Sequence, residues 1–212
     1  MNNTTQISEI FSDLNINNID YIILRKHELI LENIENNDID LLISFSDLKK
    51  VINIFKNKKL LTYTDNKFDN TYLYGAKPHR HFYNKELNIN FDISFDISYK
   101  SINQKEFIPI NDSDLDYIWE KKIKIQKENF YYFKMDDNSQ LIHLISHCIF
   151  NKNNFSDYYS KKIIQLLENI DEKIFLKMLE TIFYKFSKKL LELLKAHKFE
   201  VIFEDYLSFK EY

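Results

Sequence analysis

Alternating apolar and polar residues predict two half-buried strands that carry acidic side chains. Residues 38–43 read Asp-Ile-Asp-Leu-Leu-Ile, and residues 90–96 read Asn-Phe-Asp-Ile-Ser-Phe-Asp. A period of two residues places both aspartates of each segment on one face of its strand. Strand interiors disfavour Asp, so acidic residues on two strands require an explanation. If the two strands are neighbours in one sheet, their carboxylates converge.

The other hydrophobic patterns predict an α+β protein whose second half is helical. Extended segments are expected over residues 19–24, 38–44, 60–64, 71–74, 79–83, 87–99, 107–110 and 130–135. Helical spacing occurs over residues 4–17, 46–58, 112–122, 137–151, 156–169, 171–195 and 199–209. We therefore expect a mixed β-sheet with flanking helices in an α/β domain of residues 1–135, and a helical region of residues 136–212 packed against it.

Composition and charge exclude several classes of protein. The chain has 212 residues, a formal net charge of −3 and 44% hydrophobic residues, which suffice for a core and do not suggest nucleic-acid binding. The single cysteine, Cys148, excludes an internal disulfide, and no segment has the pattern of a signal peptide or a membrane span. These features favour a cytoplasmic protein. The single glycine, Gly75, excludes a glycine-rich phosphate loop.

The acidic residues of the two strands suit a metal-dependent site. Converging carboxylates repel one another unless a cation or a proton neutralises them. Mg²⁺ (or Mn²⁺) prefers oxygen ligands, and Mg²⁺ is commonly held by one or two carboxylates together with substrate phosphates. Asp38, Asp40, Asp92 and Asp96 are therefore the carboxylates among which metal ligands and catalytic residues are sought. The alternative is structural, with Asp38 capping the strand after a turn and Asp40 facing water.

The order of these motifs resembles the nucleotidyltransferase superfamily of the DNA polymerase β type. In that superfamily a strand ends at a phosphate-binding turn, an Asp-x-Asp strand follows, and a third acidic residue lies on a neighbouring strand. A closer resemblance is to a little-characterised bacterial nucleotidyltransferase-like family, whose members often accompany surface-polysaccharide biosynthesis. It rests on Ile-Leu-Arg at 23–25, Asp-Ile-Asp-Leu-Leu at 38–42, Phe-Asp-Ile at 91–93 and Leu-Ile-His-Leu-Ile-Ser-His at 141–147.

The resemblance implies a nucleotidyltransferase-like sheet and a metal-dependent transfer of a nucleotidyl or phosphoryl group to a hydroxyl. It implies a nucleotide or nucleotide-linked donor and a sugar or polyol acceptor. Asp38 and Asp40 would hold the metal, and Asp92 would complete the site and orient or deprotonate the acceptor hydroxyl. Replacing Asp40 with Asn is expected to abolish turnover and to leave the fold nearly intact.

The chain departs from the superfamily pattern at the phosphate-binding turn, where Arg25 and Lys26 replace Gly-Ser. Without glycine the backbone cannot approach a triphosphate as closely. A guanidinium can bind phosphate oxygens instead, because its fork of N–H groups matches their geometry. We therefore expect Arg25 and Lys26 to bind phosphate. The alternative is a solvated strand end.

A basic cluster beside the only glycine provides further candidates. Lys77, His79, Arg80 and His81 could hold a donor diphosphate or an acidic sugar, or could belong to a surface hairpin. A metal site at His79 and His81 is disfavoured, because three or four ligands are needed and the sequence offers no others there.

One more carboxylate and two helical histidines complete the candidates. The resemblance favours Asp92 over Asp96 as the third carboxylate, because Asp92 best matches the family position. Strand residues four apart lie about 13 Å apart, so the two are not expected to hold the same ion. Asp96 could serve a substrate hydroxyl or be solvated. His143 and His147 lie four apart on one helical face without the glutamate of a zincin motif. We expect one or both to reach the cleft, His147 as a substrate-binding residue, or to satisfy a buried hydrogen bond.

Three other interpretations stay open at this point. The chain could be a nucleotidyltransferase that modifies protein or RNA, as toxin-type relatives do. It could be a degenerate domain that binds a nucleotide or a protein partner without catalysis, which the missing Gly-Ser turn favours and the three carboxylates oppose. The resemblance could also be accidental, in which case the carboxylates would lie far apart in the fold.

Overall fold

The computed structural model describes residues 3–30, 38–62, 80–86, 88–100 and 107–210. Several expected features lie outside these ranges, namely the strand at 71–74, Lys77 and His79.

Seven strands in the described part of the chain form one mixed sheet, in the order β3-β4-β5-β2-β1-β9-β8. Their bounds are Leu61–Thr62 (β3), Arg80–Asn84 (β4), Ile89–Ser94 (β5), Asp38–Ile43 (β2), Tyr21–Ile23 (β1), Tyr131–Lys134 (β9) and Ile123–Gln126 (β8). Strand β2 runs parallel to β5, β1 runs parallel to β9, and the other neighbouring strands are antiparallel. A separate antiparallel pair consists of β6 (Ser98–Lys100) and β7 (Phe107–Pro109).

Helices precede, interrupt and follow the sheet. The first half contains α1 (Asn3–Ile16), α2 (Leu48–Asn57), α3 (Asp112–Glu120) and short 3₁₀ turns at His27–Leu29 and Phe45–Asp47. The second half contains α4 (Asp137–Ser146), a π-helical segment (His147–Lys152), α5 (Asp157–Leu167), α6 (Glu172–Phe183), a 3₁₀ turn (Tyr184–Phe186), α7 (Ser187–Lys195) and α8 (Phe199–Ser208). The expected α+β class and the largely helical C-terminal half are confirmed. Within the described residues, the helices are too short or too polar to cross a membrane.

The two acidic strands are neighbours, as their sequence pattern required for the carboxylates to converge. In the parallel pair of β2 and β5, Asp40 lies opposite Asp92, and Asp38 lies opposite Asn90. In the antiparallel pair of β4 and β5, His81 lies opposite Asp92. Asp40, Asp92 and His81 therefore form a row across three strands on one face of the sheet.

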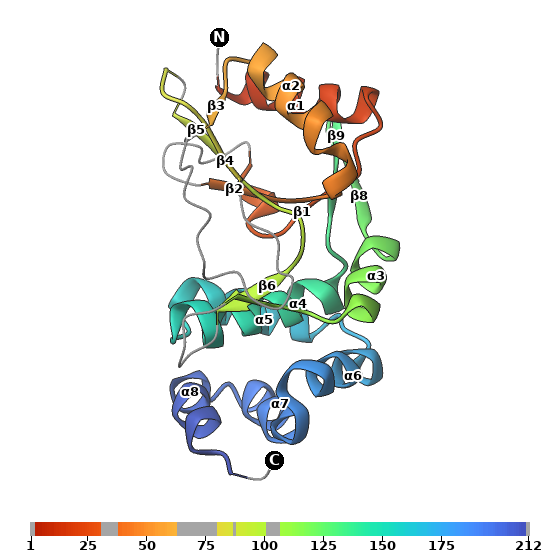
Figure 1. Ribbon diagram of the computed structural model, residues 1–212. Helices are drawn as coiled ribbons and strands as arrows, with labels where there is room; N and C mark the ends of the chain where they lie inside the picture. Colours follow the sequence, from red (N-terminus) through yellow and green to blue (C-terminus); the bar gives the residue numbers. More distant parts are fainter. Residues whose placement is uncertain (1–2, 31–37, 63–79, 87, 101–106, 211–212) are drawn as a thin grey trace.

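The sheet separates two hydrophobic cores, and this determines which way the acidic row faces. Tyr21 and Ile23 pack with residues of α1 and α2 on one face. Ile22 and Leu42 pack with the helical half on the other face, and Figure 1 shows α4 and α5 on that side. Asp40 is two residues from Leu42 on the same strand, so it faces the helical half.

Three elements differ from the sequence-based expectations. The long strand expected over residues 87–99 ends at Ser94, because the chain bends there before β6 begins in a separate pair. The helix expected over residues 171–195 is interrupted at Tyr184, whose φ of 50° cannot continue a right-handed helix. Strand β8 was not expected, although residues 123–126 alternate as Ile-Lys-Ile-Gln; its residues are mostly exposed because it lies at the edge of the sheet.

Candidate functional site

A cavity of about 160 Å³ lies where the acidic face of the sheet meets the helical half. Its lining from the first half is Leu24, Arg25, Asp40, Asp92, Ser94, Asp96, Ile97 and Ser98, and its lining from the second half is His143, His147 and Asn151. Three carboxylates and one guanidinium belong to this lining, so an excess of two negative formal charges remains when all four are ionised. The cavity therefore suits a cation or a polar molecule better than an apolar one.

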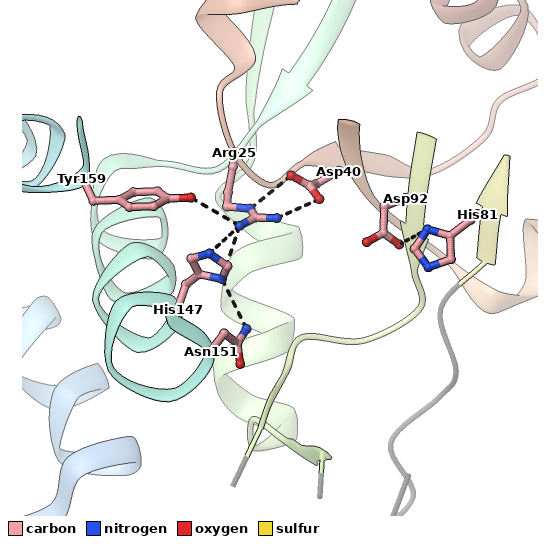
Figure 2. A network of polar contacts seen from close by, with 7 residues as sticks. All are labelled: Arg25, Asp40, His81, Asp92, His147, Asn151 and Tyr159. Carbon is pink, nitrogen blue, oxygen red and sulfur yellow. Dashed lines mark hydrogen bonds and ion pairs between the residues drawn. The ribbon is translucent and has the colours of Figure 1, made fainter. Parts of the chain in front are cut away.

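Arg25 and Asp40 form a two-point ion pair at the side of this cavity (Figure 2). The Arg25 Nη2 donates to Asp40 Oδ1 at 2.8 Å, and Nε donates to Oδ2 at 3.1 Å. The side chains are 20% and 12% exposed, so the pair is largely shielded from solvent. Arg25 follows β1, and the Leu24 N–H donates to the Asp40 carbonyl, which fixes the loop beside β2.

The helical half contacts the same guanidinium from the opposite side. Arg25 Nη1 donates to His147 Nε2 at 2.6 Å and reaches the Tyr159 hydroxyl at 3.5 Å. Asn151 Nδ2 lies 3.2 Å from His147 Nδ1 (Figure 2). His147 and Asn151 belong to the π-helical segment that continues α4, and such segments are often found at functional sites. Arg25 thus joins the sheet to the helical half through one planar group.

Burial shifts the pKa values of the groups in this network. Burial raises the pKa of the Asp40 carboxyl, as do the nearby Asp92 and Asp38, and together they outweigh the lowering effect of the Arg25 guanidinium. Burial lowers the pKa of Arg25, but the ion pair with Asp40 outweighs it and raises the pKa, so Arg25 stays charged. Burial, followed by the positive charge of Arg25, lowers the pKa of His147 to about 2. His147 is therefore neutral at pH 7 and accepts the hydrogen bond from Arg25.

The other two carboxylates of the cavity have different surroundings. Asp92 is 21% exposed on its side chain, and His81 Nδ1 lies 3.7 Å from its Oδ1 (Figure 2). Asp96 is buried in the bend after β5 rather than in a strand. The straight strand from Asp92 to Asp96 that the sequence-based expectation assumed is therefore not present, because β5 ends at Ser94. The bend returns Asp96 to the cavity that Asp92 also lines.

The cavity partly meets the requirements of Mg²⁺. In the described residues, no group of three or more His, Cys, Asp and Glu side chains is arranged to hold a metal ion. Mg²⁺ is often held by only one or two carboxylates, with water and substrate phosphates completing the shell. Asp40 and Asp92, at paired register positions, fit this smaller requirement. Arg25 donates to both oxygens of Asp40, so a metal ion at Asp40 would share these oxygens with the guanidinium.

The sequence-predicted residues separate into two groups by position. Arg25, Asp40, Asp92, Asp96 and His147 line the same cavity. The remaining described candidates lie outside that lining, at Lys26, Asp38, Arg80 and His81.

The candidates outside the cavity have other surroundings. Asp38 is exposed at the start of β2, and with His81 it lines a second hollow of about 180 Å³ at the end of the sheet. Arg80 is exposed at the start of β4. Lys26 Nζ lies 5.9 Å above the centre of the Tyr158 ring. Asp38 is not part of the lining of the cavity that Asp40 and Asp92 share, although its charge contributes to the raised pKa of Asp40.

Several residues of the network were not singled out from the sequence. Asn151 lies four residues after His147, which lies four residues after His143. This spacing places the three side chains on one helical face and could have indicated Asn151. The sequence offered no comparable signal for Tyr159 or Ser98, because their approach to the cavity depends on tertiary packing and on the bend after β5.

Lys26 adopts the backbone conformation for which glycine is best suited. Its φ of 53° and ψ of 29° place it in the left-handed region directly after Arg25, at the start of a 3₁₀ turn. A non-glycine residue in this region is strained by about 1–2 kcal/mol. The turn that replaces Gly-Ser therefore keeps a glycine-like backbone while carrying a cationic side chain.

Replacing Lys26 with Gly is expected to stabilise the fold by about 0.5–1 kcal/mol, because relief of the strain exceeds the entropy that glycine adds to the unfolded chain. Thermal unfolding checks this as a rise of roughly 1–4 °C in Tm. Lys26→Ala is the matched control, since it removes the same side chain without relieving the strain. An increase in Tm for Lys26→Ala equal to that for Lys26→Gly would contradict the explanation.

Comparison with known proteins gives no relative from which to transfer a function. No model of a known protein family matches the chain, and no curated protein matches it significantly. The functional proposal therefore depends on the geometry of the cavity and on the motifs described in the sequence.

Proposed function

We propose that the protein is a metal-dependent transferase that moves a nucleotidyl or phosphoryl group to a hydroxyl of a small molecule or sugar, in a nucleotidyltransferase-like fold. The observation that carries this proposal is the pairing of Asp40 with Asp92 on adjacent parallel strands, facing one cavity together with Arg25. Carboxylates supply the ligands that Mg²⁺ prefers, and a guanidinium supplies the group that binds phosphate oxygens. The resemblance to nucleotidyltransferase-like proteins of surface-polysaccharide synthesis supports the same assignment.

Each of these residues has its own role in the transfer. Asp92 accepts the proton of the acceptor hydroxyl, whose oxygen forms a bond to phosphorus as the bond from phosphorus to the leaving oxygen breaks. Arg25 offsets the negative charge that develops on the phosphate oxygens, while Asp40 and His147 fix its orientation. When bound, Mg²⁺ held by Asp40 and Asp92 would supply further neutralisation of the phosphate charge.

A thermal unfolding experiment tests this proposal. Nucleoside triphosphates and CDP- or UDP-linked sugars are added with and without Mg²⁺ to the wild type, to Asp92→Asn and to Asp116→Asn. Asp116 is exposed on α3 away from the cavity, so its variant is the matched control. Saturation at about a hundredfold over Kd stabilises by roughly 2.7 kcal/mol, which corresponds to about 5–10 °C for a chain of this size. We expect a metal-dependent rise that Asp92→Asn loses and Asp116→Asn keeps.

One observation favours a second candidate function. Because Arg25 donates to both oxygens of Asp40, its positive charge neutralises the negative charge of that carboxylate without any metal. A degenerate domain that binds a nucleotide or a protein partner without catalysis would have this property. A nucleotide-dependent rise in Tm that is equal with and without Mg²⁺, and equal in Asp92→Asn, would favour this alternative over the transferase.

A further inference from the structure

The part of the cavity between the bend after β5 and helix α4 contains buried polar atoms without a partner. His143 is only 7% exposed, and its Nε2 has no hydrogen-bond partner in the described structure. The Ser98 hydroxyl is likewise buried without a partner. Both residues line the cavity, together with the buried Asp96. A buried polar atom without a partner costs about 1–3 kcal/mol, so this wall is suited to binding a polar molecule.

Packing around His143 leaves one imidazole nitrogen on this wall. The Tyr99 hydroxyl lies 3.1 Å from His143 Nδ1, and burial raises the pKa of Tyr99, so the tyrosine keeps its proton and can donate to Nδ1 or accept from it, according to the tautomer of the ring. When Tyr99 donates to Nδ1, the imidazole carries its own hydrogen on Nε2; in the other tautomer Nε2 is an acceptor. Burial and the nearby Arg25 lower the pKa of His143 to about 3, so the ring is neutral at pH 7. The wall thus combines a neutral imidazole nitrogen, a hydroxyl and a carboxyl group.

Size and charge restrict the molecule that fits there. A volume of about 160 Å³ is below the roughly 300–1,000 Å³ of pockets that enclose drug-sized ligands, so a whole nucleotide does not fit. The lining contains three carboxylates, Asp40, Asp92 and Asp96, and one guanidinium, Arg25. It therefore disfavours any anion other than the donor phosphate that Arg25 binds. Hydroxyl groups can donate to Asp96, and they can either donate to or accept from His143 Nε2 and Ser98.

We propose that His143, Ser98 and Asp96 form the acceptor subsite of the transferase, and that its ligand is a compact, uncharged polyhydroxy compound such as a polyol or a monosaccharide. This proposal rests on the proposed function, because it places the acceptor hydroxyl beside Asp92 in the same cavity. The donor nucleotide lies outside this subsite, and only its phosphate reaches Arg25.

Binding of ribitol, glycerol and glucose, each added alone without nucleotide or metal, tests the subsite. The readout is the imidazole nitrogen resonance of His143 in NMR spectra, assigned by its absence in His143→Gln, together with Tm. We expect at least one compound to shift the Nε2 resonance saturably. A pentanediol of the same chain length as ribitol, which lacks the inner hydroxyls, should bind at least about tenfold more weakly, because it leaves buried polar groups unpaired. Ser98→Ala should weaken binding about fivefold, the loss of one neutral hydrogen bond.

The outcomes separate this proposal from the proposed function. If none of the three compounds moves the resonance or Tm while nucleotides with Mg²⁺ still do, the acceptor subsite is wrong and the transferase proposal stands. If a polyol binds and nucleotides do not, the polyol-binding site stands, and its role as an acceptor subsite fails together with the transferase proposal. Equal binding of ribitol and the pentanediol would overturn the assignment to hydroxyl recognition. Asp116→Asn again serves as the control that should bind as the wild type does.

Discussion

Replacing Asp40 with Asn is expected to destabilise the protein by about 3 kcal/mol, which lowers Tm by roughly 6–12 °C. The change leaves the Arg25 guanidinium buried beside His147 and Tyr159 without its counter-charge. Removal of one partner of a buried ion pair is costly because the other charge stays in a low-dielectric environment. Chemical denaturation with parallel thermal melts measures the effect. This result differs from the sequence-based expectation of a nearly intact fold, because the sequence alone does not reveal the ion pair.

Two variants make this test specific. Asp38→Asn changes an exposed carboxylate on the same strand and should alter stability by no more than about 0.5 kcal/mol. The double variant Arg25→Met with Asp40→Leu removes both charges and should recover most of the loss, since an apolar pair of similar volume can replace a buried ion pair. Equal stability of Asp40→Asn and the wild type would show that the ion pair is not a stabilising contact.

Lowering the pH from about 7 to about 5 is expected to remove roughly 2 kcal/mol of stability for each of His143 and His147. Burial lowers the pKa of His143 from 6.5 to about 3 and that of His147 to about 2. The unfolded state therefore binds protons below about pH 6.5 that the folded state does not accept, and stability falls as pH falls. Burial also lowers the pKa of His27, to about 4, so protonation of His27 in the unfolded state further reduces the stability as the pH falls. The raised pKa of Asp40 acts in the opposite direction and offsets part of the loss.

Denaturant unfolding at several pH values checks this expectation. His143→Gln removes one titrating ring, so its slope of unfolding free energy against pH should be smaller by about 1.4 kcal/mol per pH unit below pH 6.5. His197→Gln is the comparison variant, because His197 is exposed and lies outside the cavity. Identical slopes in the wild type and His143→Gln would mean that His143 is protonated in the folded protein.

The period of two residues was enough to predict acidic side chains on one face of β2 and of β5, because side-chain alternation is a local property. Their convergence also required the two strands to pair, which this pattern does not determine. The pattern could not predict that Asp96 returns to the cavity, because that placement depends on a bend after Ser94. Helical spacing likewise gave α4 and α5, but it could not reveal that His147 would accept a hydrogen bond from Arg25, 122 residues earlier in the chain. The interruption at Tyr184 has no local signal, because neither glycine nor proline marks it.

The position of the sheet between two cores has a consequence for cooperativity. Strand β1 contributes Tyr21 and Ile23 to one core and Ile22 to the other, so each core forms against a surface that the other helps to hold in place. A fragment ending at residue 135 would expose Ile22 and Leu42 to water and would lose the helical partners of Arg25. Residues 1–135 and residues 136–212 are therefore expected to unfold in one transition, as a single folding unit.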